Sequence, residues 1–360
     1  MTVTPSSSKQ PDPSTWQPFT RLSLDRLPIP FWASALILGL FVLVEQVMER
    51  AVLAPMPSTI AISLVGRRLA LPILTVYMLL ALKTLKISAL PKLARLRPTV
   101  QINDDEYASH VQRILYTGPR TEAGLLVLSL AMVLAWFVML RLPLPLMTNV
   151  YLPSDSLQAL FVIMAYIIFG WAGLTLVFST TRFGFGLGAL AQRPLKVNVF
   201  DPDDLLPFGA LSLRHSLTVA VTVLLLIIPL GRPTEPEEYT VVLLASLASL
   251  SALILPLLGV HRQMGKARAA AAARISEELE RSQVRLMEGS ELDLAAATEL
   301  ANRTDKLVLL RATMNKSPSW PFRNASSVVR VSLAALSPLI YFILSEMLRT
   351  YLLPLMGIGS

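Results

Sequence analysis

Residues 261–322 read HRQMGKARAAAAARISEELERSQVRLMEGSELDLAAATELANRTDKLVLLRATMNKSPSWPF. This segment is polar and rich in helix-forming residues, whereas the sequence on both sides of it is apolar. An apolar stretch of about 20 residues is long enough to cross the ~30 Å hydrocarbon core of a bilayer as a helix. We therefore expect a membrane protein in which one large polar helical element precedes the last membrane span.

The composition of the whole chain supports a membrane protein. Hydrophobic residues make up 53% of the 360 residues and charged residues only 16%, with a mean hydropathy of +0.57. Soluble domains carry about 25% charged residues, so a soluble core of this size would not accommodate so much apolar surface. We expect the net charge of +8 to reflect Lys and Arg gathered on the cytoplasmic side. Because basic runs are not interleaved with aromatic residues, we expect no nucleic-acid partner.

Seven apolar stretches predict an all-α polytopic bundle of about seven transmembrane helices. They lie at residues 31–53, 60–85, 123–140, 157–178, 217–230, 239–260 and 326–348. Lys and Arg are commonest in alternate connecting segments, which places the N-terminus in the cytoplasm and the C-terminus outside. Arg67 and Arg68 depart from this trend, because they lie near the outer end of the second stretch. The excess of Arg over Lys indicates a GC-rich bacterial genome, so we expect a bacterial plasma membrane.

The chain divides into four parts on this basis. Residues 1–30 are rich in Pro, Ser and Thr, which predicts a disordered cytoplasmic N-terminus. Residues 31–260 form a six-span membrane domain. Residues 261–324 form a cytoplasmic helical hairpin, and residues 325–360 form the final transmembrane helix with a short external tail.

The hairpin is predicted from two apolar stripes at helical spacing. The first stripe consists of Ala271, Ile275, Leu279, Ser282 and Leu286. Gly289 ends this helix, and Ser290 with Asp293 forms a capping box for the next one. The second stripe consists of Leu300, Leu307, Leu310 and Met314. Both stripes are shorter than three heptads, so they fit either a hairpin within one chain or pairing between subunits.

Four residues are candidate membrane-interface anchors of this element. Arg262, Lys266 and Arg268 precede its first acidic residue, and each would contribute about 1 kcal/mol of attraction to anionic headgroups. Trp320 stands just before the last span, where an indole ring suits the membrane–water interface.

A possible polar pathway is predicted from ionisable residues inside the spans, because such residues are costly in hydrocarbon and therefore mark function. Glu45 and Glu49 lie one turn apart on the first span, and Glu346 and Arg349 lie three apart on the last. Tyr341 lies near the latter pair. The alternative is an ion pair of Glu346 with Arg349 at the outer end of the helix.

Two further segments carry expectations about local structure. An amphipathic helix is predicted at residues 104–115, lying on the inner leaflet with its apolar face formed by Tyr107, Val111, Ile114 and Leu115. Residues 184–188, GFGLG, lack the pattern of a dinucleotide-binding loop, so we interpret them as a flexible bend at the membrane face.

Metal-binding chemistry has little basis in the sequence. Asp203 and Asp204 are interpreted as helix N-caps, with a divalent ion as the alternative. His215 and His261 fall near the cytoplasmic ends of neighbouring spans and could approach each other, but a zinc site needs more ligands. The chain has no cysteine, so thiolate sites are excluded. We expect no cofactor.

Parts of the C-terminal half resemble a family of uncharacterised bacterial multi-pass integral membrane proteins. The resemblance is carried by VNVFD at 197–201, LLPF at 205–208, LRHSL at 213–217 and SWPF at 319–322. It implies a bacterial membrane protein, and no activity, cofactor or site residue comes with it.

The functional prediction follows from the largest polar feature, residues 262–316, which is helical and amphipathic. The chain lacks a Walker loop, an H-E-x-x-H motif and a Ser-His-Asp order, so we expect no enzyme. We expect a membrane sensor or scaffold that acts through its cytoplasmic helices, as a homo-oligomer or with a cytoplasmic protein partner. The alternative is an oligomeric ion channel or solute transporter.

Overall fold

The computed structural model describes residues 13–52, 58–139, 153–198, 202–230, 236–288, 294–316, 329, 332–333 and 336–347. Within these residues the regular structure is helical and no strand occurs. One antiparallel bridge joins Val100 to Leu195. Every structural statement below concerns the described residues.

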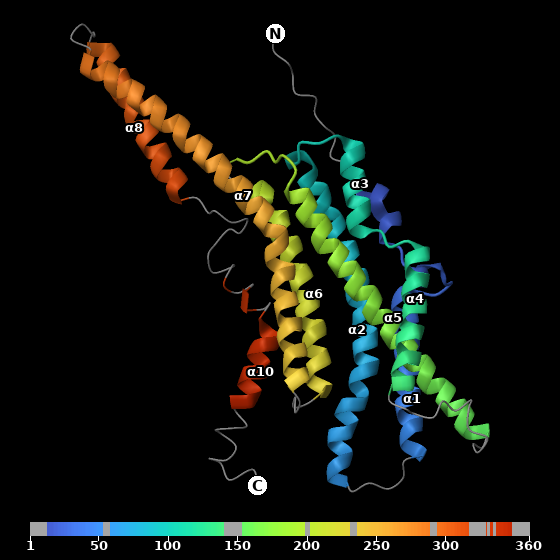
Figure 1. Ribbon diagram of the computed structural model, residues 1–360. Helices are drawn as coiled ribbons and strands as arrows, with labels where there is room; N and C mark the ends of the chain where they lie inside the picture. Colours follow the sequence, from blue (N-terminus) through green and yellow to red (C-terminus); the bar gives the residue numbers. More distant parts are fainter. Residues whose placement is uncertain are drawn as a thin grey trace.

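Long apolar helices dominate the molecule (Figure 1). They are α1 (Phe31–Val52), α2 (Ser58–Leu96), α4 (Pro119–Met139), α5 (Pro153–Ala191), α6 (Leu206–Leu230) and α7 (Pro236–Glu288). In the described part of the chain, five helices are long and apolar enough to span a membrane, and residues 31–44 form a shorter apolar helix. The expected all-α architecture, with several helices long and apolar enough to span a membrane, is confirmed. The number seven stays a prediction, since the last expected span is only partly described.

Helix α7 (Pro236–Glu288) joins the sixth predicted span to the polar element. The predicted span at residues 239–260 and the first helix of the predicted hairpin are one continuous helix of 53 residues. Pro256 lies within it. The distal part of α7 extends beyond the bundle, and α8 (Leu294–Lys316) lies beside it (Figure 1). The shorter elements are η1 (Pro13–Thr20), η2 (Ser23–Arg26), η3 (Arg97–Thr99), α3 (Asp104–Leu115), η4 (Pro202–Leu205) and α10 (Ser337–Met347).

The prediction of disorder throughout residues 1–30 is wrong for the described residues from 13 onward. Two 3-10 helices, η1 and η2, fold against the bundle. Trp16 and Leu22 are buried, each in one of the two hydrophobic core clusters. These apolar side chains stabilise an otherwise polar segment, because burying a large side chain yields about 1.5–3 kcal/mol.

The predicted helix at residues 104–115 is confirmed as α3, but it does not present its apolar face to a leaflet. Tyr107, Val111, Ile114 and Leu115 are all buried in a protein core formed with α2, α5, α6 and α7. The Tyr107 ring also contacts Trp16, with ring centroids 5.8 Å apart. Amphipathic spacing is the same for a helix on lipid and a helix on protein, so the sequence did not distinguish the two.

Tyr107 supplies the first testable prediction. Its hydroxyl donates to the Leu93 carbonyl oxygen at 2.5 Å, in a buried position near the end of α2 where helix carbonyls lack partners. Tyr107→Phe should lower the free energy of unfolding by about 1–2 kcal/mol, because it leaves that buried carbonyl unpaired. Unfolding in mixed detergent micelles measures the loss. Tyr341→Phe, on an exposed position of α10, is the control and should change nothing.

The interpretation of residues 184–188 as a bend is also wrong. These residues lie inside α5, which continues to Ala191. Their glycines serve close packing: a Cβ atom at Gly186 would lie 2.6 Å from the Ile114 Cγ1 atom of α3. Small residues that let helices approach closely are typical of membrane-protein interfaces.

Candidate functional site

The element predicted to carry function is a pair of helices, which we call the α7–α8 arm: residues 262–288 of α7 together with α8. Arg268 donates from Nη2 to the Met314 carbonyl oxygen at 2.7 Å. Farther along, Arg303 Nη2 lies 2.9 Å from Glu278 Oε2. Because the earlier residue on α7 pairs with the later residue on α8, the two helices are antiparallel.

Arg268 makes a contact that differs from its predicted role as a headgroup anchor. Met314 lies in the last turn of α8, where carbonyl groups have no partner within the helix. The Arg268 guanidinium therefore caps α8 and complements the negative end of its dipole. Arg262 and Lys266 are exposed, so their attraction to headgroups stays a prediction. Trp320 lies outside the described residues.

The apolar stripes predicted for the arm are only partly buried. Ser282 and Met314 are buried between the two helices, whereas Leu310 is exposed. Several large apolar side chains point outward instead: Val284, Met287, Val308, Leu309 and Leu310, with Met287 87% and Leu309 67% exposed. We call these five residues the exposed arm set. Apart from Leu310, its members lie off the two narrow apolar stripes predicted from helical spacing, so the sequence did not indicate them.

The base of the arm is fixed to the end of α5. Gln263 donates from Nε2 to the carbonyl oxygens of Ala191 at 2.8 Å and Arg193 at 2.6 Å, and its Oε1 accepts from the Leu195 amide at 3.0 Å. One turn earlier, Gly259 packs so closely that an added Cβ atom would lie 3.0 Å from the Ala191 carbonyl oxygen. One side chain thus pairs three backbone groups just beyond α5. No motif marks Gln263 in the sequence.

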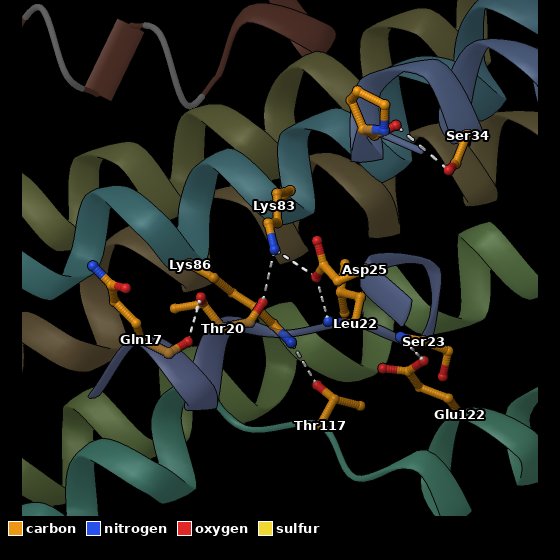
Figure 2. Close-up of polar contacts among 11 residues, drawn as sticks. Gln17, Thr20, Leu22, Ser23, Asp25, Ser34, Lys83, Lys86, Thr117 and Glu122 are labelled. Atoms are coloured by element: carbon orange, nitrogen blue, oxygen red, sulfur yellow. Dashed lines mark hydrogen bonds and ion pairs between the residues drawn. The ribbon is translucent and has the colours of Figure 1, made fainter. Parts of the chain in front are cut away.

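A second polar site joins the N-terminal segment to the bundle, as Figure 2 shows. Lys83 Nζ lies 2.5 Å from Asp25 Oδ2, and Lys86 Nζ donates to Thr117 Oγ1 at 2.8 Å. Glu122 Oε2 accepts from the Ser23 amide at 2.9 Å. Lys86 is 2% exposed and Glu122 3%, so both charged groups lie out of reach of headgroups.

A third site is a cavity of about 470 Å³ between α5, α6 and α7. His215 borders it, and its Nδ1 lies 3.2 Å from the Ala252 carbonyl oxygen. Ala252 precedes His261 on α7 by two and a half turns, about 13 Å, so the two histidines, which the sequence allowed to approach each other, do not lie side by side. In the described part of the chain, no three His, Cys, Asp or Glu side chains gather into a metal site.

Most residues of the predicted polar pathway have side chains outside the described part of the structure. Tyr341 lies on α10 and is exposed. The side chains of Glu45, Glu49, Glu346 and Arg349 lie outside the described residues, as do those of Arg67 and Arg68. The pathway, and the channel or transporter alternative that depends on it, stay predictions.

Comparisons with protein families, curated proteins and solved structures found no match. The resemblance to uncharacterised bacterial membrane proteins therefore stays an expectation carried by its quoted residues.

Proposed function

We propose that this protein is a non-enzymatic sensor or scaffold of a bacterial plasma membrane, acting through the α7–α8 arm as a cytoplasmic helical hairpin. It spans the membrane about seven times, with its N-terminus in the cytoplasm and its C-terminus outside. In support, the arm and α3 extend at the same end of the bundle (Figure 1). Basic residues of the connecting segments, among them Arg97, Arg193 and Lys196, belong to that end, which suits the side where Lys and Arg concentrate.

The observation that carries the proposal is the continuity of α7. At 1.5 Å per residue its 53 residues span about 80 Å, far more than a bilayer core needs. The membrane part of the helix and the arm share one hydrogen-bonded backbone. A tilt or rotation of α7 within the membrane therefore moves the arm, and a partner on the arm is coupled to the bundle.

The exposed arm set supplies the contact surface in this proposal. Val284 and Met287 lie three residues apart on α7 and so share a face, while Val308 and Leu309 add apolar surface on α8. By the pairings of Arg268 with Met314 and of Glu278 with Arg303, Val308 and Leu309 lie nearer the base of the arm than Val284 and Met287, so the set forms two exposed apolar areas. Exposed apolar areas on a polar helical element mark protein interaction sites. These apolar side chains are exposed, so they do not pack between the two helices of the arm.

The test places a photo-crosslinking amino acid at Val308 or Met287 in intact cells and identifies the crosslinked protein. Binding of that partner is then measured on purified full-length protein with Met287→Ser and Leu309→Ser combined. We expect affinity to fall at least about tenfold, as for the loss of central apolar contacts. The control combines Ala273→Ser and Ala301→Ser, two exposed arm positions outside the set, and should bind like the parent.

The proposal fails if crosslinks from both positions reach only lipid. It also fails if the arm variant and the control bind the identified partner equally well. Equal circular dichroism and equal elution volumes of the two variants ensure that a difference in affinity reflects the surface rather than the fold.

A further inference from the structure

A groove of about 590 Å³ lies between α2 and α6. Apolar side chains form most of its wall, including those of Leu80, Leu213, Leu217 and Val221. Both helices are long and apolar enough to cross a membrane, and Leu217 is exposed, so the groove is open to the hydrocarbon. Such a wall suits an acyl chain, because it offers the same apolar surroundings as the bilayer interior.

Two basic side chains line the same groove. Lys92 lies near the end of α2 and Arg214 near the start of α6, and their charges are close enough to repel each other. Farther along the groove, the Tyr77 hydroxyl of α2 donates to the Thr218 carbonyl oxygen of α6 at 3.4 Å. The two helices are therefore antiparallel, and both charges lie on the same side of this contact.

No acidic side chain of the described residues compensates these two charges. Within that part of the chain, the side chains of Lys92 and Arg214 have no hydrogen bond or ion pair. Asp203 and Asp204 belong to η4, which packs against both helices, but they are exposed and do not border the groove. Lys92 and Arg214 are half-buried, so water screens their repulsion only in part. Because ionisable residues between membrane helices usually pair with an opposite charge, we expect an anion from outside the chain here.

The anion that fits both parts of the groove is the phosphate of a lipid. A phosphate group accepts hydrogen bonds from an ammonium and from a guanidinium alike. Basic pockets between transmembrane helices on the cytoplasmic side bind anionic lipid headgroups, and Lys92 lies at the end of α2 that leads to Arg97. A free phosphate would compensate the two charges but would leave the apolar wall of the groove without a partner.

We infer that the groove between α2 and α6 binds an anionic phospholipid, whose phosphate lies between Lys92 and Arg214 and whose acyl chain lies along the apolar wall. The site goes beyond the proposed function of the arm and does not depend on it. Since α6 also packs along α7, a bound lipid touches a direct neighbour of the helix that forms the arm.

The probe is a phosphatidylglycerol that carries a photoreactive diazirine in one acyl chain. The matched probe is the phosphatidylcholine with the same chains, whose choline group neutralises the phosphate charge. Each is mixed at increasing mole fraction into phosphatidylcholine nanodiscs that hold the purified full-length protein, and crosslinked peptides are identified by mass spectrometry. We expect phosphatidylglycerol to label the parts of α2 and α6 that border the groove at a mole fraction about tenfold lower than phosphatidylcholine, since each facing cation strengthens binding of an anionic headgroup severalfold.

The role of the charges is tested with a double variant. Lys92→Gln combined with Arg214→Gln should remove the preference, so that the two probes label the groove equally. The control combines Arg113→Gln and Arg120→Gln, which remove the same total charge from exposed positions outside the groove. This control should retain the preference of the parent for phosphatidylglycerol.

The role of the apolar wall is tested by filling the groove. Ala81 is half-buried and borders it, so Ala81→Phe occupies the space while both cations stay in place, and both probes should lose their labelling there. Ala131→Phe adds the same ring at an exposed position of α4, outside the groove, and should behave like the parent.

Equal labelling of the parent by the two probes would overturn the inference, because it would show that the cations select no anionic headgroup. Unchanged labelling in Ala81→Phe would overturn it as well. Loss of the phosphatidylglycerol labelling on addition of millimolar inorganic phosphate would show that the site takes a free phosphate and not a lipid. If the double charge variant does not fold, the two probes on the parent and on Ala81→Phe still decide.

Discussion

Glu122→Ala is expected to lower the free energy of unfolding by about 3 kcal/mol and to release the N-terminal segment from the bundle. The Glu122 carboxylate accepts from the Ser23 amide, and it lies close enough to Lys86 to attract that buried ammonium electrostatically. Alanine would leave the amide unpaired and remove a compensating charge from Lys86. Both interactions lie in a buried site, where water poorly replaces the lost hydrogen bond and the lost charge.

Two measurements check this result. Unfolding in mixed detergent micelles gives the free energy, and tryptic cleavage at the exposed Arg21 and Arg26 reports release of the segment. Cleavage should become faster in Glu122→Ala. Glu122→Gln keeps an acceptor but loses the charge, so it should lose about half as much stability.

Glu280→Ala is the matched control for Glu122→Ala, since it removes an exposed carboxylate from α7. It should leave both stability and cleavage unchanged. If Glu122→Ala and Glu280→Ala behave alike, the Glu122 carboxylate is not needed to hold the N-terminal segment, and the Lys83–Asp25 ion pair together with burial of Trp16 and Leu22 suffices.

Gly259→Leu is expected to cost about 3 kcal/mol, at the upper end for overpacking, and to separate the base of the arm from α5. A Cβ atom at this position would already lie 3.0 Å from the Cβ and carbonyl oxygen of Ala191 and 3.1 Å from its carbonyl carbon. Backbone atoms in a helix cannot rotate away as a side chain can. The helices must therefore move apart, and the hydrogen bonds of Gln263 to this end of α5 should break with them.

Gly265→Leu is the matched control, because it introduces the same side chain into the same helix where an added Cβ atom meets nothing within 4 Å. Its stability should equal or slightly exceed that of the parent, since leucine favours helix more than glycine does. The distance between spin labels on cysteines introduced at Arg193 and Arg262 would report whether the arm base stays docked. Equal distances in the two leucine variants would contradict the expected separation.

Residue patterns predicted the helices of the candidate arm site but not the partners of its polar side chains. The helical element after residue 261 was predicted, with Ser282 and Met314 on its buried face. The partners of its polar groups were not, because Arg268 and Gln263 bind backbone carbonyls, which every residue possesses. A hydrogen bond to a backbone carbonyl does not depend on the residue type that carries the carbonyl, so the sequence does not indicate which residue accepts it.

Hydrophobicity and spacing by themselves determined that this chain is helical, has several helices long and apolar enough to cross a membrane, and carries a polar helical element before its C-terminus. These properties depend on residues close together in the chain and on their transfer from water to an apolar medium. Only the tertiary structure decided which apolar faces meet protein and which meet lipid. It alone placed α3 and the N-terminal segment in the core, and Ala252 rather than His261 beside His215. Both environments accept the same apolar side chains, so the choice depends on how helices distant in sequence pack against one another.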